Sequence, residues 1–125
     1  KNLENKKTKK KKKDIKKKNK KNLYFKNIIK DIKKVKRLKL KPHTIVVKEL
    51  GMACSYPGTF NSSIHSIISS TTYKTAVVKT IKAGGCNCSR VNFIGAYFAA
   101  LKGLNSIPKV WIKKTETSEK ILRIK

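Results

Sequence analysis

Acidic residues are scarce in this sequence: six Asp and Glu stand against 33 Lys and Arg, which gives a formal net charge of +27 at pH 7. Long apolar runs are missing too, and no stretch approaches the roughly 20 residues that a membrane-spanning helix needs. Cysteine is limited to three residues, an odd number that makes no disulfide framework, so we expect a reducing, cytoplasmic or nuclear setting. No segment alternates polar and apolar residues for long enough to predict a β-sheet.

The positive charge is concentrated near the N-terminal end. Residues 1–41 hold 21 of the 33 basic residues and three of the six acids. Residues 1–22 have almost nothing to bury and a dense block of lysine, so we predict a disordered tail. Such a basic segment either binds a polyanion without reading its sequence or is a solvated extension. The first residue is Lys rather than Met, so we expect the natural protein to begin further upstream.

Residues 23–42 combine lysines with an apolar pattern at helical spacing, at Ile28, Ile32, Val35 and Leu38. The pattern predicts a basic amphipathic helix or linker that Pro42 closes. Such a helix fits a membrane surface or a partner protein, and equally the core face of a larger domain.

Residues 43–125 are expected to form one partial helical domain. Thr44 can cap a short helix over residues 44–54, and Thr59 can start a second helix. The second helix has an apolar stripe, at Phe60, Ile64, Ile67 and Ile68. His65 lies beside that stripe, and we interpret it as a structural or surface residue rather than a ligand.

The next helices have clear boundaries in the sequence. Thr72 can cap a third helix, and Gly84 can end it. A nearly uncharged segment follows, and we expect it to be a central helix whose small-residue face lets neighbours pack closely, at Gly95, Ala96, Ala99 and Ala100. Pro108 suits the first turn of a short helix with Trp111 and Ile112 facing inward, and residues 117–125 are expected to form a terminal helix.

The stretch "AGGCNCSR", residues 83–90, gathers the side chains with the most chemical potential. A metal loop, a phosphate cradle and a tight turn into a helix all fit it. Cys86 and Cys88, joined by Cys54 or His65, could hold zinc. However, Cys-x-Cys lacks the paired spacing of a zinc site, so small turn or buried cysteines are the favoured interpretation.

Several short motifs follow one another along the chain, in the order "GMACSYPGTF", "SIHSII", "AGGCNCSR", "IGA", "IP" and "WI". In this order they resemble the C-terminal part of the ADP-ribosylglycohydrolase family, from near Thr44 to the "WI" pair at Trp111. The resemblance is greatest to the branch with the J-crystallins and selenoprotein J, where Gly-Gly-Asp-Asn-Cys-Ser-Arg precedes a buried helix.

The resemblance implies a fold and a chemistry. It implies that residues 43–125 are the C-terminal portion of a larger all-α orthogonal bundle. In active members, two magnesium ions help water cleave a glycosidic bond of ADP-ribose, and a Gly-Gly-Asp-x-Asp-Thr loop supplies ligands. Cys86 and Cys88 stand at the two Asp positions and Ser89 at the Thr position. The loop backbone at Gly84, Gly85 and Asn87 could still meet an ADP-ribose-like ligand.

The exchange of carboxylates for thiols removes the hard oxygen ligands that magnesium requires. The family's other ligands come from acidic motifs in its N-terminal half, whereas Asp14 and Asp31, the only aspartates here, lie in lysine-rich sequence. We therefore expect no magnesium cofactor and no catalytic residue in this chain, which is predicted to be a fragment or degenerate member without hydrolase activity. Two alternatives stay open: the C-terminal part of an active magnesium-dependent hydrolase whose N-terminal half is missing, and a basic nucleic-acid- or membrane-associated protein that acts through its Lys-rich tail.

Overall fold

The computed structural model describes residues 22–124, and every regular element in this range is helical, as the all-α prediction requires. The chain falls into two compact units that divide between Lys34 and Val35. The backbone is helical from residue 22 to residue 37 and turns at residues 38–40, so this helix ends before Pro42, the residue predicted to close it. Residues 1–21, which hold nearly all of the predicted tail, lie outside the described residues.

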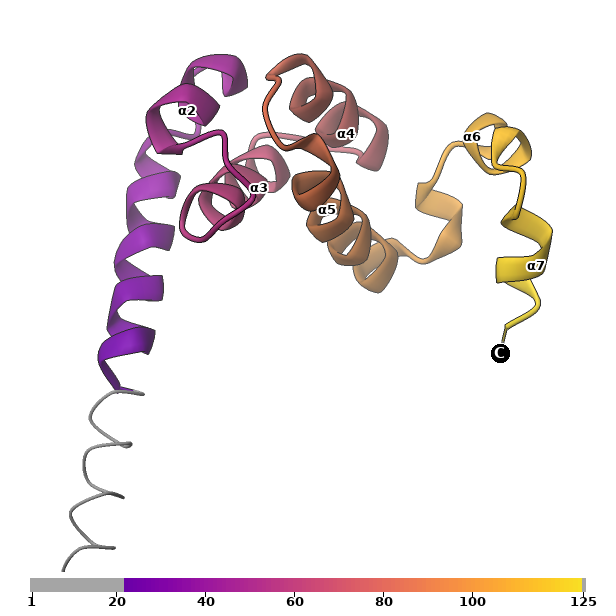
Figure 1. The fold of residues 1–125 in the computed structure, drawn as a ribbon, viewed down its shortest axis with the longest axis horizontal. Helices are drawn as coiled ribbons and strands as arrows, with labels where there is room; N and C mark the ends of the chain where they lie inside the picture. Colours follow the sequence, from indigo (N-terminus) through magenta and orange to yellow (C-terminus); the bar gives the residue numbers. More distant parts are fainter. Residues whose placement is uncertain (1–21, 125) are drawn as a thin grey trace, which may run out of the picture. The chain divides into compact units, whose positions relative to one another are not determined.

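The second unit is built on four helices, followed by three short ones (Figure 1). The elements in order are α2 (His43–Leu50), α3 (Gly58–Ile68), α4 (Tyr73–Lys82), α5 (Asn87–Lys102), η1 (Leu104–Ser106), α6 (Lys109–Lys114) and α7 (Ser118–Leu122). Helix α3 packs against α2, α4 and α5, and α4 also packs against α2 and α5. The candidate site lies where the loop after α2 meets the loop between α4 and α5.

The ends of α2 differ from the prediction. The helix begins at His43 with Pro42 in the N-cap position and no side-chain cap, so Thr44 is not its cap. It ends at Gly51, whose φ of 108° leaves the helical region, so residues 51–54 form a loop. Helix α3 then begins at Gly58, one residue before the predicted Thr59.

The predicted start of α4 is confirmed. The Thr72 hydroxyl accepts a hydrogen bond from the Thr75 amide at 3.2 Å, and the Thr75 hydroxyl lies 3.3 Å from the Thr72 amide nitrogen. This reciprocal capping box satisfies two amides that the first turn of a helix leaves without partners.

The apolar core is small and centres on α4 and α5, with Ile67 from α3. Its main cluster consists of Ile67, Ala76, Val77, Ile94 and Phe98, with Tyr73, Val91 and Trp111 packed against them. Four more apolar residues are buried outside this cluster, namely Val35, Val46, Val47 and Ala83. Of the apolar stripe predicted on α3, Ile67 is buried and Phe60, Ile64 and Ile68 are partly buried. The buried residues of α3 are mostly small or polar, namely Gly58, Asn61, Ser62, Ser63, His65, Ser66 and Ile67. Small side chains allow close helix approach, and that favours them over the larger Ile64 and Ile68 at these contacts.

The prediction that neighbouring helices pack on the small-residue face of α5 was wrong. It buries a single stripe, at Arg90, Ile94 and Phe98. Ala96, Ala99 and Ala100 are exposed, and so are Phe93 and Tyr97. The neighbours α3 and α4 cover only one side of this helix.

Candidate functional site

Two loops meet at the start of α5. Gly84 and Gly85 both have positive φ, 73° and 71°, a conformation that suits glycine. A Cβ on Gly85 would lie 2.7 Å from both the Cβ and the carbonyl oxygen of Met52. The Cys86 amide donates to that same Met52 oxygen at 2.9 Å. The glycine pair therefore lets the loop after α2 pack against the loop before α5, and Met52 fills the space beside Gly85.

A disulfide joins the same two loops. Cys54 is bonded to Cys86, with 5.4 Å between their Cα atoms, a usual separation for a disulfide. The expectation that the cysteines form no disulfide was wrong, because the fold brings together two residues that are 32 positions apart. Disulfides are rare in reducing compartments, so the bond weighs against the setting we expected, although the compartment itself stays a prediction.

The other two predicted side chains of the loop also lie beside Cys86. The Cys88 sulfur is 3.7 Å from the Cys86 sulfur, and the Ser89 hydroxyl is 3.2 Å from it. Cys88 is a free, exposed thiol in the first turn of α5. The structure thus brings Cys86, Cys88 and Ser89 together and adds Cys54 to them, whereas Met52, which seats the loop, was not predicted.

Arg90 holds the loop from within. Its side chain is fully buried, and Nη2 donates to the Gly84 carbonyl and, at 2.8 Å, to the Asn87 side-chain oxygen. The Gly84 oxygen and the Asn87 side chain are therefore engaged by Arg90. The Arg90 Nε and Nη1 atoms are buried without a hydrogen-bond partner among the described residues.

The side chains present do not fit a magnesium site. Of the three positions that the resemblance matches to ligands, one sulfur is in a disulfide, one is a thiol, and only Ser89 offers oxygen. Within residues 22–124 no three His, Cys, Asp or Glu side chains cluster in a way that could hold a metal ion. Magnesium takes oxygen ligands in octahedral geometry, and this loop does not supply them.

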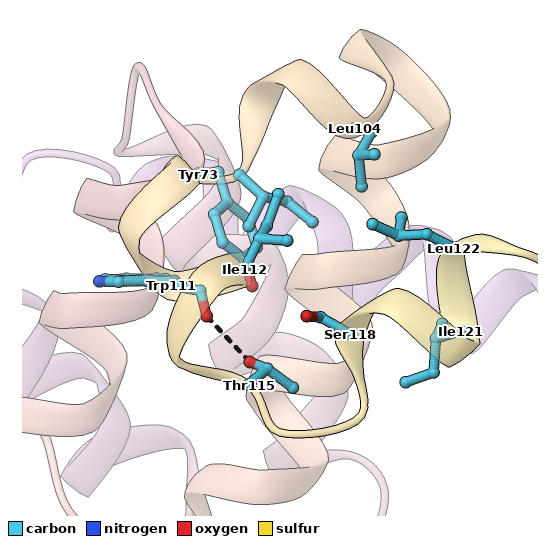
Figure 2. A pocket seen from close by; sticks show the side chains of 9 residues that line it. Tyr73, Leu104, Trp111, Ile112, Thr115, Ser118, Ile121 and Leu122 are labelled. Atoms are coloured by element: carbon cyan, nitrogen blue, oxygen red, sulfur yellow. Dashed lines mark hydrogen bonds between the residues drawn. The ribbon is translucent and has the colours of Figure 1, made fainter.

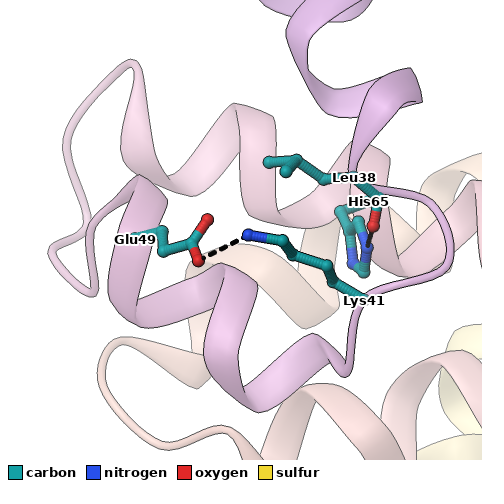
Figure 3. A network of polar contacts seen from close by, with 4 residues as sticks. All are labelled: Leu38, Lys41, Glu49 and His65. Atoms are coloured by element: carbon teal, nitrogen blue, oxygen red, sulfur yellow. Dashed lines mark hydrogen bonds and ion pairs between the residues drawn. The ribbon is translucent and has the colours of Figure 1, made fainter.

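A second polar cluster lies inside the fold and was largely missed from the sequence. His43 and His65 are 6% and 0% exposed, and their rings stack at a centroid distance of 5.2 Å. Their Nδ1 atoms are 2.9 Å apart. His65 Nε2 is 3.0 Å from the Leu38 carbonyl oxygen, and Figure 3 shows this second contact together with the exposed Lys41–Glu49 ion pair. Because a carbonyl oxygen only accepts, His65 Nε2 carries the proton and donates to Leu38. In a neutral ring His65 Nδ1 is then the acceptor, so His43 Nδ1 donates to it.

The buried surroundings of His43 and His65 favour the neutral form of both rings. The pKa of His43 is lowered from 6.5 to about 3, chiefly by burial and to a smaller extent by the charges of His65, Lys79 and Arg90. Burial also lowers the pKa of His65, although its hydrogen bond to Leu38 opposes that shift. The Thr80 hydroxyl lies 3.2 Å from His43 Nε2 and continues the network into α4. The structural interpretation of His65 is confirmed, and we assign the pair no ligand.

An apolar pocket lies near the C-terminal end of the described residues (Figure 2). Its volume is about 300 Å³, and its lining comes from α4, η1, α6 and α7 and the loops beside them, with Tyr73, Trp111, Ile112 and Leu122 prominent. Trp111 and Ile112 are partly buried, and Trp111 packs edge to face against Tyr73 with centroids 5.8 Å apart. No charged side chain lines this pocket, so it can make apolar contacts but presents no ionisable group to a ligand.

Two relatives are similar to this segment. Crystallin J1A of Tripedalia cystophora is 36% identical over 77 residues, and crystallin J1B of the same organism is 32% identical over 76 residues. These matches cover 62% and 61% of this chain but only 24% of each crystallin, so the chain spans about a quarter of the relatives' length. They support the resemblance to the J-crystallin branch. No family model and no solved structure matches the chain.

Within residues 22–124 no helix is both long and apolar enough to cross a bilayer.

Proposed function

We propose that this chain is a fragment or degenerate member of the ADP-ribosylglycohydrolase family, with a structural, crystallin-like role and no hydrolase activity of its own. The names of the two similar proteins, both crystallins, favour a structural role. The observation that carries the proposal is the disulfide of Cys86 with Cys54, at the position where active members have their first loop aspartate.

The loop is put to a structural use here. Its glycines seat Met52, its first cysteine is covalently tied to the loop after α2, and its arginine closes a buried hydrogen-bond network. The first two contacts fix the loop against the loop after α2 and the third fixes it against α5, so the loop serves packing instead of metal binding. The backbone at Gly84, Gly85 and Asn87 stays our prediction for any residual contact with an ADP-ribose-like ligand.

The first experiment measures magnesium binding and hydrolysis. We expect no release of ADP-ribose from ADP-ribosylated substrates with or without Mg²⁺, and no change of melting temperature on adding Mg²⁺, because a ligand stabilises only the fold that binds it. A matched variant, Cys54→Ser with Cys86→Asp and Cys88→Asp, opens the disulfide and restores both carboxylates. Mg²⁺ stabilising this variant alone would assign the loss to the cysteines, while magnesium-dependent release by the natural chain would favour the alternative of an active hydrolase. ADP-ribose added alone tests the loop backbone as a ligand contact.

We infer a second candidate function from the helix at residues 22–37. In its first two turns Tyr24, Phe25 and Ile29 are 55%, 50% and 53% exposed, while lysines occupy the opposite arc, at Lys26, Lys30, Lys33 and Lys34. An aromatic and aliphatic face flanked by lysines suits the surface of an anionic bilayer, where rings insert and ammonium groups meet phosphates. A nucleic acid would use the lysines and leave the aliphatic face bare.

Vesicle sedimentation distinguishes these partners. We expect the full chain to bind vesicles of phosphatidylcholine with phosphatidylserine and not vesicles of phosphatidylcholine alone. The double variant Phe25→Gln and Ile29→Gln should bind more weakly, whereas Leu40→Gln, which changes a leucine that is 96% exposed outside this face, should not. Equal binding by both variants, or salt-sensitive binding to DNA with no affinity for vesicles, would reject the membrane surface as partner.

A further inference from the structure

Three sulfur atoms meet at the junction of the two loops. Cys54 and Cys86 share a disulfide, and the free thiol of Cys88 lies 3.7 Å from the Cys86 sulfur. Cys54 and Cys88 are both exposed, and Cys86 is partly buried between them. The Cys86 sulfur is thus the shared neighbour of two other sulfurs, one bonded to it and one in contact with it.

We propose that this cluster is a thiol–disulfide exchange site in which Cys86 changes partner between Cys54 and Cys88. The Cys88 thiolate attacks the Cys86 sulfur, a Cys86–Cys88 bond forms, and the Cys54–Cys86 bond breaks. Cys54 leaves as a thiolate and takes up the proton that Cys88 lost. One disulfide is present before and after the step, so no oxidant or reductant is consumed.

The geometry favours attack at Cys86. A separation of 3.7 Å is close to the van der Waals contact of two sulfur atoms, so Cys88 needs little movement to reach its target. The Ser89 hydroxyl also contacts the Cys86 sulfur, at 3.2 Å, and helps to hold that sulfur in place. Cys86 stands at the N-cap of α5 and Cys88 in its first turn, so both attacker and target are fixed by one rigid element.

The exchange is also reversible in this arrangement. When Cys54 is released, the hydrogen bond from the Cys86 amide to the Met52 oxygen and the packing of Met52 on Gly85 still hold the two loops together. The freed Cys54 thiol therefore stays near the new disulfide and can attack it in turn. The two states differ in one respect: the loop after α2 is covalently tied to α5 in the first and free of that tie in the second.

Peptide mapping under non-reducing conditions separates the two states. The full chain is treated with oxidised glutathione, incubated, and its free thiols are blocked with N-ethylmaleimide before trypsin digestion. Trypsin places Cys54 in residues 49–74 and both other cysteines in residues 83–90. The first state gives these two peptides cross-linked with one maleimide on Cys88. The second gives residues 49–74 with the maleimide on Cys54 and residues 83–90 with an internal disulfide.

We expect both states in the natural chain. In Cys88→Ser only the cross-linked peptides should remain and maleimide labelling of Cys54 should be lost, while Thr71→Ala, a change at an exposed residue outside the sulfur cluster, should keep both states. In Cys54→Ser, oxidised glutathione should close Cys86 and Cys88 into an internal disulfide. The proposal is overturned if the natural chain yields only the cross-linked form, if it yields three blocked thiols, or if Cys54→Ser keeps glutathione on both cysteines.

Discussion

His43 and His65 are buried groups that bind a proton less readily in the folded chain than in the unfolded chain. The folded pKa of His43, about 3, lies below its ordinary 6.5, so below pH 6.5 the unfolded chain binds a proton that the folded chain excludes. Stability from this group is therefore complete above pH 6.5 and is lost as the pH falls towards 3. His65 changes in the same direction.

Acid should accordingly destabilise the fold before carboxylates titrate. Between pH 6.5 and 5 we expect the free energy of unfolding to fall with a slope that approaches about 1.4 kcal/mol per pH unit from His43, and the lowered pKa of His65 adds to this slope. Urea denaturation followed by circular dichroism at several pH values measures it. The double variant His43→Gln with His65→Gln should lose the slope, and an unfolding free energy that is constant over this range in the natural chain would contradict the burial of the pair.

The glycines of the loop offer a matched pair of substitutions. Gly85 and Gly103 have similar positive φ, 71° and 67°, but a Cβ meets Met52 at 2.7 Å in the first case and nothing within 4 Å in the second. We expect Gly103→Ala to cost about 2 kcal/mol, because φ 67° with ψ −170° strains any residue with a Cβ, and Gly85→Ala to cost about 3 kcal/mol or more, because a steric clash adds to its backbone strain.

Chemical denaturation of both glycine variants, with the disulfide intact, checks this difference. Equal losses of stability would mean that the contact between Met52 and Gly85 does not hold the two loops together.

At the scale of the elements, residues close together in the chain set the start of α4 and the end of α5. Thr72 and Thr75 cap α4 through their own side chains, and Gly103 ends α5. These signals involve residues close together in the chain, so the sequence was enough to find them. The burial of the small and polar side chains of α3 depends on which helices lie against them, and the pattern of its isoleucines did not reveal it.

The capping box gives a prediction for one element. Thr72→Ala removes the side chain that accepts from the Thr75 amide and should cost about 1 kcal/mol of stability. Thr71→Ala, a change at the exposed neighbouring residue, is the control and should leave stability almost unchanged. Thermal melting of the two variants compares them, and equal melting temperatures would show that the cap adds nothing.

At the scale of the molecule, α5 has an uncovered apolar side. Phe93, Tyr97 and Leu101 are 40%, 42% and 60% exposed and recur every four residues, so they share one face of the helix. The chain spans only a quarter of the length of the crystallins it resembles. A small core and an uncovered apolar face make the chain by itself marginally stable.

We expect the isolated chain to be partly molten or to associate as its concentration rises. Light scattering should show this association, and Tyr97→Gln with Leu101→Gln should reduce it because the exposed apolar area falls. Leu40→Gln, which changes an exposed leucine outside α5, should not reduce it. A monomer with a sharp, cooperative melt at all concentrations would contradict the prediction.

The sequence by itself determined the helical class, the ends of α4 and α5 and the absence of carboxylates from the glycine loop, because each depends on residue type and near neighbours. Only the tertiary structure decided that Cys54 meets Cys86, that His43 stacks on His65, and that Met52 needs Gly85. These contacts join residues 22 to 33 positions apart, and spacing along a chain does not encode which distant side chains a fold brings together.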